Sequence, residues 1–129
     1  MDNVELSSRR LSDVVVVAPT GQLDHANAQR LQEALASVLD GAGSRPSALL
    51  FDFSGVEYIS SMGLRVLMVA AKQMRSQNAR IAVAGLQPVV GEIFDIARFK
   101  HVLETFPSVR AALQQLSEPA LVAYDAAAK

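Results

Sequence analysis

The hydrophobic pattern alternates between short apolar runs and longer segments with helical spacing. The clearest short runs are Val14 to Ala18, Ala48 to Phe53 and Arg80 to Ala84, each followed by Pro, Ser or Gly. Short runs of this kind, bounded by turn residues, are typical of buried strands. Val4 to Leu11 alternates more weakly and suits an edge strand, and Val102 to Phe106 predicts a last short strand.

Between these runs, apolar residues recur every three or four positions, which predicts four helices. Their apolar positions are Ala28, Leu31, Leu35, Val38 and Leu39; Leu64, Leu67, Met68, Ala71 and Met74; Val89, Ile93, Ile96 and Ala97; and Val109, Ala112, Leu113 and Leu116. Either Asp24 or Asn27 could cap the first helix. In the second, Val66, Val69 and Ala70 widen the apolar arc, so we expect protein to cover most of it.

A strand, helix and strand in this order favour a right-handed crossover between parallel strands. The sequence therefore predicts an α/β fold: a single domain with a mixed, mostly parallel β-sheet of four to five strands and about four α-helices. Pro119 breaks the last helical pattern. We place the domain at residues 1–117 and expect residues 118–129 to form a loosely held C-terminal tail.

The composition narrows the functional classes. The 129 residues are 50% hydrophobic, which is enough for one domain with its own core. A formal net charge of -1 gives no reason to expect nucleic acid as a partner. With no cysteine, thiolate metal sites and cysteine nucleophiles are excluded. Since no apolar run is long enough to span a bilayer, we expect no membrane partner and a cytoplasmic location.

Candidate catalytic residues are few. His25 and His101 are the two histidines, and neither has a second ligand at a metal-binding spacing. Residues 59–63 read Ile-Ser-Ser-Met-Gly, which is not the Gly-x-Ser-x-Gly turn of esterases. Asp24 and Asp52 could form an acid/base or metal pair, but helix caps and strand ends explain isolated aspartates more often. We therefore expect no enzyme, no cofactor and no metal site.

The second helix begins beside two adjacent serines, Ser60 and Ser61. The start of a helix offers free N–H groups and favours negative charge, so a phosphate on either serine would be accommodated there. The same phosphate would change what can dock nearby. Asp24 follows the second predicted strand, Asp52 lies near the end of the third, and the serines come just beyond it, so we hypothesise that they converge at one edge of the sheet.

Three stretches together carry a resemblance to a known family. They are Gly21 to His25, Phe51 to Val56 and Tyr58 to Leu64. In this order and at these separations they resemble the STAS domain of bacterial anti-sigma factor antagonists. The resemblance covers Val14 to about Leu116.

The resemblance implies a partner-switching regulator. In this family the unphosphorylated antagonist binds an anti-sigma factor that is also a serine-protein kinase, and the sigma factor is released. The kinase then phosphorylates a serine two residues before a glycine, which here is Ser61 before Gly63, and a PP2C-type phosphatase reverses the modification. Asp24 matches an aspartate that lies beside that serine in the family.

This chain departs from the family pattern at two positions. The common pattern is Asp-Ser-Ser-Gly or Asp-Ser-Thr-Gly, whereas here Ser60 replaces the acidic residue and Met62 replaces the second hydroxyl. Ser60 is therefore a competing acceptor. The spacing to Gly63 and Leu64 favours Ser61. The alternative is that Ser61 only caps the helix.

The expected partner-binding residues surround the acceptor. They are Asp24, His25, Ser60, Met62, Gly63, Arg65 and Lys72. The same fold also serves as an accessory subunit of lipid-transport ABC systems, as a stressosome-type scaffold and as the tail of anion transporters, and the first two are the alternative functions for this chain.

Overall fold

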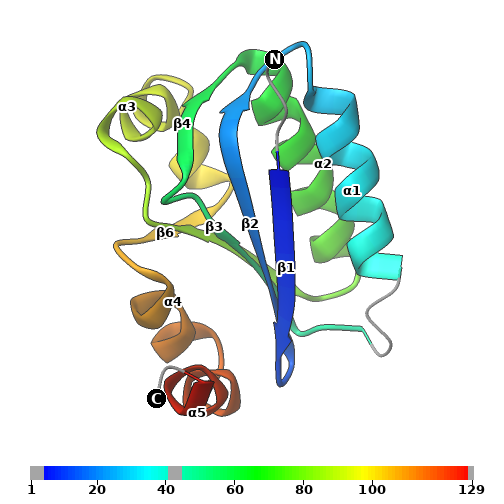
Figure 1. Ribbon diagram of the computed structural model, residues 1–129, viewed down its shortest axis with the longest axis vertical. Helices are drawn as coiled ribbons and strands as arrows, with labels where there is room; N and C mark the ends of the chain where they lie inside the picture. The colour runs from blue at the N-terminus through cyan, green and yellow to red at the C-terminus, as the bar shows by residue number, and fades with distance from the viewer. Residues whose placement is uncertain (1–4, 41–44, 128–129) are drawn as a thin grey trace.

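The computed structural model describes residues 5–40 and 45–127, which form a sheet with helices on both faces (Figure 1). In chain order the elements are β1 (Glu5–Leu11), β2 (Val14–Leu23), α1 (Ala28–Asp40), β3 (Ala48–Asp52), β4 (Val56–Ile59), α2 (Ser61–Ser76), β5 (Arg80–Ala84), α3 (Pro88–Ile96), the 3-10 helix η1 (Phe99–His101), β6 (Glu104–Phe106), α4 (Val109–Leu116) and α5 (Glu118–Ala127).

The sheet is mixed and mostly parallel, as predicted. Its strand order is β1-β2-β3-β5-β6, with β4 paired to the far end of β2. Only the β1–β2 pair is antiparallel among the described strands. The described residues hold six strands and five α-helices, slightly more than the four to five strands and four helices expected.

Strand β2 is longer than its apolar pattern predicts. We expected Pro19 to end it, but Pro19 lies inside the strand opposite Leu6, and pairing with β4 continues to Leu23 after an irregularity at Gly21. Gly21 has a φ of 93°, a conformation that glycine adopts readily, and its N–H donates to the Gly55 carbonyl at 2.9 Å. The extension carries Leu23 to the start of α2.

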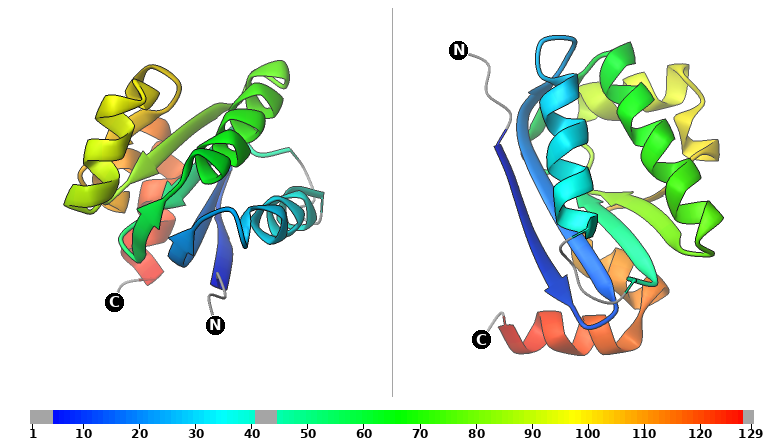
Figure 2. Two further views of the ribbon diagram at one scale, coloured as in Figure 1. Left: turned by 90° about the horizontal axis from the view of Figure 1, so that it is seen from above. Right: turned by 90° about the vertical axis from the view of Figure 1, so that its right-hand side faces the viewer.

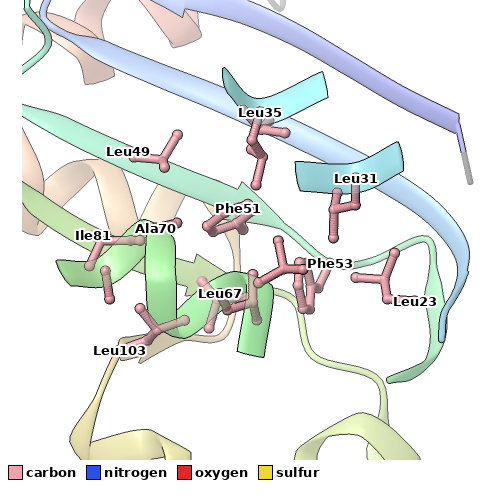
Figure 3. Packing of buried hydrophobic residues seen from close by; sticks show 14 of the residues in the cluster. Leu23, Leu31, Leu35, Leu49, Phe51, Phe53, Leu67, Ala70, Ile81 and Leu103 are labelled. Carbon is pink, nitrogen blue, oxygen red and sulfur yellow. The ribbon is translucent and has the colours of Figure 1, made fainter. Parts of the chain in front are cut away.

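The sheet separates two hydrophobic cores. Val15 and Val17 face the larger core under α1 and α2, where Phe51 and Phe53 also pack (Figure 3). Val14 and Val16 face the smaller core under α4 and α5. Because alternate residues of a strand point to opposite faces, a strand buried on both sides needs a continuous apolar run, which is what β2 shows.

Helix α3 buries a different face from the one we expected. Val89 and Ile96 were assigned to its apolar side, yet they are 53% and 84% exposed. Val90 and Phe94 fill the core instead. The pattern was ambiguous because this short helix is apolar over most of its surface, so spacing alone did not select the buried side.

The expectation of a loosely held tail is wrong for residues 118–127. They form α5, in which Ala120 is fully buried and Leu121, Ala123 and Tyr124 pack against the smaller core. Pro119 breaks α4 and opens a new helix, since proline is well tolerated in a first turn.

Candidate functional site

The start of α2 distinguishes the two adjacent serines. Ser60 is the N-cap residue, with extended backbone, and its side-chain oxygen accepts a hydrogen bond from the Gly63 N–H at 3.3 Å. Ser60 is half-buried, whereas Ser61 is the first helical residue and is exposed. The capping role that sequence reasoning left open for Ser61 therefore belongs to Ser60, and Ser61 is left exposed at the start of the helix.

A close contact places the loop after β2 beside this helix start. The Ser60 N–H donates to the Leu23 carbonyl at 2.9 Å. A Cβ atom added to Gly63 would lie 2.5 Å from the Leu23 carbonyl oxygen and 2.7 Å from Ile59 Cγ1. Only glycine fits there. Gly63 is buried, so we assign to it this packing role in place of the partner contact expected from the sequence.

The loop itself is ordered by its own hydrogen bonds. The Asp24 carboxylate accepts from the Ala26 N–H at 3.0 Å, and the Asn27 side chain accepts from the Asp24 N–H at 3.0 Å. Asn27 also donates to the Gln22 carbonyl at 2.6 Å, and it is buried directly before α1. His25 is exposed at the tip. The loop thus holds Asp24, directly after Leu23, beside the start of α2.

One face of α2 presents an exposed row that begins at Ser61. Arg65, Val69 and Lys72 follow it at spacings of four, four and three residues, and all are exposed. We call Ser61, Arg65, Val69 and Lys72 the α2 stripe. The expectation that protein covers most of this helix fails here, since Val69 is 45% exposed.

Two grooves flank the stripe, because α2 lies between α1 and the segment of α3 and η1 (Figure 2). The α1–α2 groove, of about 600 Å³, is lined by Ala28, Gln29, Gln32, Glu33, Ala36, Met62, Arg65, Val66 and Val69. The α2–η1 groove, of about 510 Å³, is lined by Ser61, Leu64, Arg65, Met68, Val69, Lys72, Ala97 and Phe99. Met62 is 39% exposed and therefore available at the surface.

Asp52 takes a different role from the other candidates. Its carboxylate accepts hydrogen bonds from the N–H and the hydroxyl of Ser54, at 3.0 and 2.8 Å, in the turn between β3 and β4. It thus acts as a turn residue. The hypothesised convergence holds for the Asp24 loop and the serines, which the Leu23–Ser60 hydrogen bond joins.

The described residues hold neither a cluster of metal-binding side chains nor a helix able to span a membrane. Residues 5–40 and 45–127 contain no group of three or more His, Asp or Glu side chains that could hold an ion. None of the helices in these ranges is both long and apolar enough to cross a bilayer. The chemistry that the site offers is an exposed hydroxyl on a surface suited to docking.

Sequence reasoning missed the apolar members of this surface. Val69 follows Ser61 by eight residues, so a search for residues on the same helix face as Ser61 would have found it. Ala97 and Phe99 come from the η1 side, and nothing in their local sequence links them to Ser61.

This chain is similar to known proteins both in sequence and in fold. BtrV of Bordetella bronchiseptica, a candidate anti-sigma factor antagonist, is 30% identical over 84% of this chain and 91% of its own length. The crystal structure of an anti-sigma factor antagonist from Mycobacterium paratuberculosis superimposes with a TM-score of 0.78 at 23% identity, covering 89% of this chain and 95% of that one.

SpoIIAA, another anti-sigma factor antagonist, has the same fold. Its unphosphorylated form gives a TM-score of 0.71 at 12% identity over 86% of this chain and 95% of its own. Its phosphorylated form gives 0.63 at 12% identity over 89% of this chain and 100% of its own. The STAS domain model matches residues 5–112. With most of its length matched, this chain belongs to the STAS domain family.

Proposed function

We propose that this chain is an anti-sigma factor antagonist controlled by phosphorylation of Ser61. The unphosphorylated form binds an anti-sigma factor that is also a serine-protein kinase, and that binding releases the sigma factor. The observation that carries the proposal is that the two serines differ in their surroundings. The Ser60 side-chain oxygen accepts the capping hydrogen bond from the Gly63 N–H, whereas Ser61 is exposed at the start of the α2 stripe.

The surface around Ser61 suits a reversible protein contact. Asp24 and His25 flank it from the loop, and Met62, Arg65 and Lys72 extend it along α2. Ser60 contributes by holding the first turn in place. In this function the chain binds a cytoplasmic partner and catalyses no reaction of its own.

A phosphate on Ser61 would act locally as a switch. It adds about two negative charges at neutral pH. The helix start tolerates that charge, because the unpaired N–H groups and the helix dipole favour an anion there. A partner packed over the same turn would meet the charge in a partly desolvated contact, where it is far more costly. Phosphorylation therefore leaves the fold intact and removes binding, and a PP2C-type phosphatase restores it.

The relatives support this assignment. BtrV shares 30% identity and is named for the same role. SpoIIAA, with the same fold, has been solved in unphosphorylated and phosphorylated forms, so a phosphorylated state is compatible with this architecture.

The test is incubation with ATP and the anti-sigma factor kinase, followed by intact mass and peptide mapping. We expect a gain of about 80 Da, one phosphate, on the wild type and on Ser60→Ala, and none on Ser61→Ala. Ser61→Ala should still bind the kinase. Because Ser60 caps α2, the free energy of unfolding of Ser60→Ala, measured in urea, should be about 0.5 to 1 kcal/mol lower than that of Ser61→Ala.

Two results would contradict the proposal. Phosphate on Ser61→Ala but not on Ser60→Ala would move the acceptor to Ser60. No phosphate on any variant, together with no kinase complex, would favour the lipid-transport accessory subunit or the stressosome-type scaffold, which would be recognised by a membrane ATPase complex or by a very large assembly.

A further inference from the structure

The α2–η1 groove has a distinctive pattern of charge. Within the described part of the chain its charged lining residues are Arg65 and Lys72, both cationic, and apart from Ser61 the others are apolar. Along the stripe the order is a hydroxyl at Ser61, a cation, the apolar Val69 and a second cation. Lys72 follows Arg65 by seven positions, so the two cations lie about 10 Å apart along the helix axis.

An exposed apolar residue, Ile96, directly precedes the wall opposite the stripe in the chain. Ala97 and Phe99 line the groove, and Ile96, directly before Ala97, is 84% exposed at the end of α3. Val69, on the α2 side, is 45% exposed. An exposed apolar residue on the stripe, with a second one directly before the far wall in the chain, is typical of a surface that a partner covers.

Neighbouring charges on the far wall do not cancel the cations of the stripe. Asp95 is paired with Lys100 at 2.7 Å. Arg98, which follows Ala97, is exposed and carries a positive charge. The groove therefore combines apolar walls with a net positive rim.

We infer that the α2–η1 groove receives an amphipathic, acidic segment of the anti-sigma partner, whose apolar side chains lie on Val69 and Ile96 and whose carboxylates meet Arg65 and Lys72. This inference rests on the proposed function and adds to it the place and chemistry of the docking segment. Charge complementarity selects this occupant over a second copy of the chain, whose stripe would bring like charges together.

The position of Ser61 in the same groove gives the phosphate a defined target. A phosphate there would stand at the end of the row that binds the carboxylates of the partner, so it would repel them and compete for Arg65. The switch would thus act on the partner's acidic segment directly, with no change in the fold.

The experiment is calorimetric titration of the unphosphorylated full chain with the anti-sigma factor kinase. We expect Lys72→Glu to weaken binding by tenfold or more and to flatten its salt dependence, because a favourable charge contact becomes repulsive. Ile96→Ser should weaken binding about tenfold with little change in salt dependence. Lys72 and Ile96 are both exposed, as are the residues changed in the controls below, so circular dichroism should show a native fold for every variant.

Matched controls lie away from the groove. Arg45→Glu makes the same charge change before β3, and Val122→Ser removes an apolar side chain that is 62% exposed on α5. Both should bind within about twofold of the wild type.

Several outcomes separate this inference from the proposed function. If the kinase binds and phosphorylates Ser61 while Lys72→Glu and Ile96→Ser bind like the wild type, the groove assignment is overturned and the switch stands. If these variants bind weakly but Ser61 is never phosphorylated, the groove stands and the switch falls. If sedimentation shows self-association of the wild type that Ile96→Ser abolishes, the groove is reassigned to a second copy of the chain. If the wild type forms no complex with the kinase, both the groove assignment and the proposed function are overturned.

Discussion

At the scale of single residues, the site depends on a position where no side chain is tolerated. Gly63 brings the first turn of α2 against the Leu23 carbonyl, and this contact fixes the Asp24 loop beside Ser61. The sequence showed Gly63 as part of a motif but not why it is glycine. That reason became visible only with the neighbouring loop in place, because the two segments are far apart in the chain.

Gly63→Ala should therefore be strongly destabilising. The added Cβ would meet backbone at 2.5 Å, and overpacking of this kind costs about 2 kcal/mol. Gly91→Ala is the control: it lies inside α3 with nothing within 4 Å of the added Cβ, so it should stabilise the protein by about 0.5 to 1 kcal/mol. Urea unfolding of both variants measures this difference, and equal stabilities would show that the contact does not hold the site.

At the scale of elements, Asp13 joins three segments at the end of the sheet away from Ser61. Its carboxylate accepts from the Ser117 hydroxyl at 2.5 Å and from the Ser47 hydroxyl at 2.5 Å. Ser117 also accepts from the Ala120 N–H at 3.2 Å, which starts α5. The hairpin of β1 and β2, the start of β3 and the junction of α4 with α5 thus meet at one carboxylate, and Figure 1 shows the hairpin and α5 together at the lower end.

This arrangement predicts a pH-dependent contribution to stability. The hydrogen bond from Ser117, and then that from Ser47, lower the pKa of Asp13 below its ordinary value of 3.8. A lowered pKa means that the ionised group stabilises the fold above pH 3.8 and that this stabilisation is lost as the pH falls through the folded pKa. Asp13→Asn should lower the free energy of unfolding by about 1 kcal/mol at pH 7.

Urea unfolding of wild type and Asp13→Asn from pH 7 to pH 3 tests this prediction. The difference between the two should be constant near neutral pH and shrink at the acid end. A difference that grows with acidity would contradict the assignment. Kinase binding at pH 7 should be unchanged, because the substitution lies at the opposite end of the sheet.

The elements also show what the sequence could and could not predict. The runs Val14 to Ala18, Ala48 to Phe53 and Arg80 to Ala84 were recognisable because most of their residues are buried on both faces of the sheet and form nearly continuous apolar stretches. Helix α5 was not predicted, because Pro119 indicates the end of a helical pattern. In the structure Pro119 lies in the first turn of a new helix. The buried face of α3 was missed because tertiary packing selected it.

At the scale of the whole molecule, the two faces of the sheet carry different features. The smaller core lies under α4 and α5 on one face, whereas α2, with its stripe and two grooves, covers the larger core on the other and begins at the carboxyl ends of β2 and β4. The motifs predicted Ser61 as the acceptor and drew attention to the loop after β2. They could not predict the η1 wall, because its residues approach α2 only through the crossover that follows β5.

The most direct test of the central claim compares the affinity of phosphorylated and unphosphorylated chain for the anti-sigma factor kinase by calorimetry. We predict that phosphate on Ser61 weakens binding by about a hundredfold or more, roughly 3 kcal/mol, while the free energy of unfolding stays within about 0.5 kcal/mol of that of the unphosphorylated chain. Equal affinity of the two forms would contradict it, since a charge at the head of the α2 stripe would then not control docking.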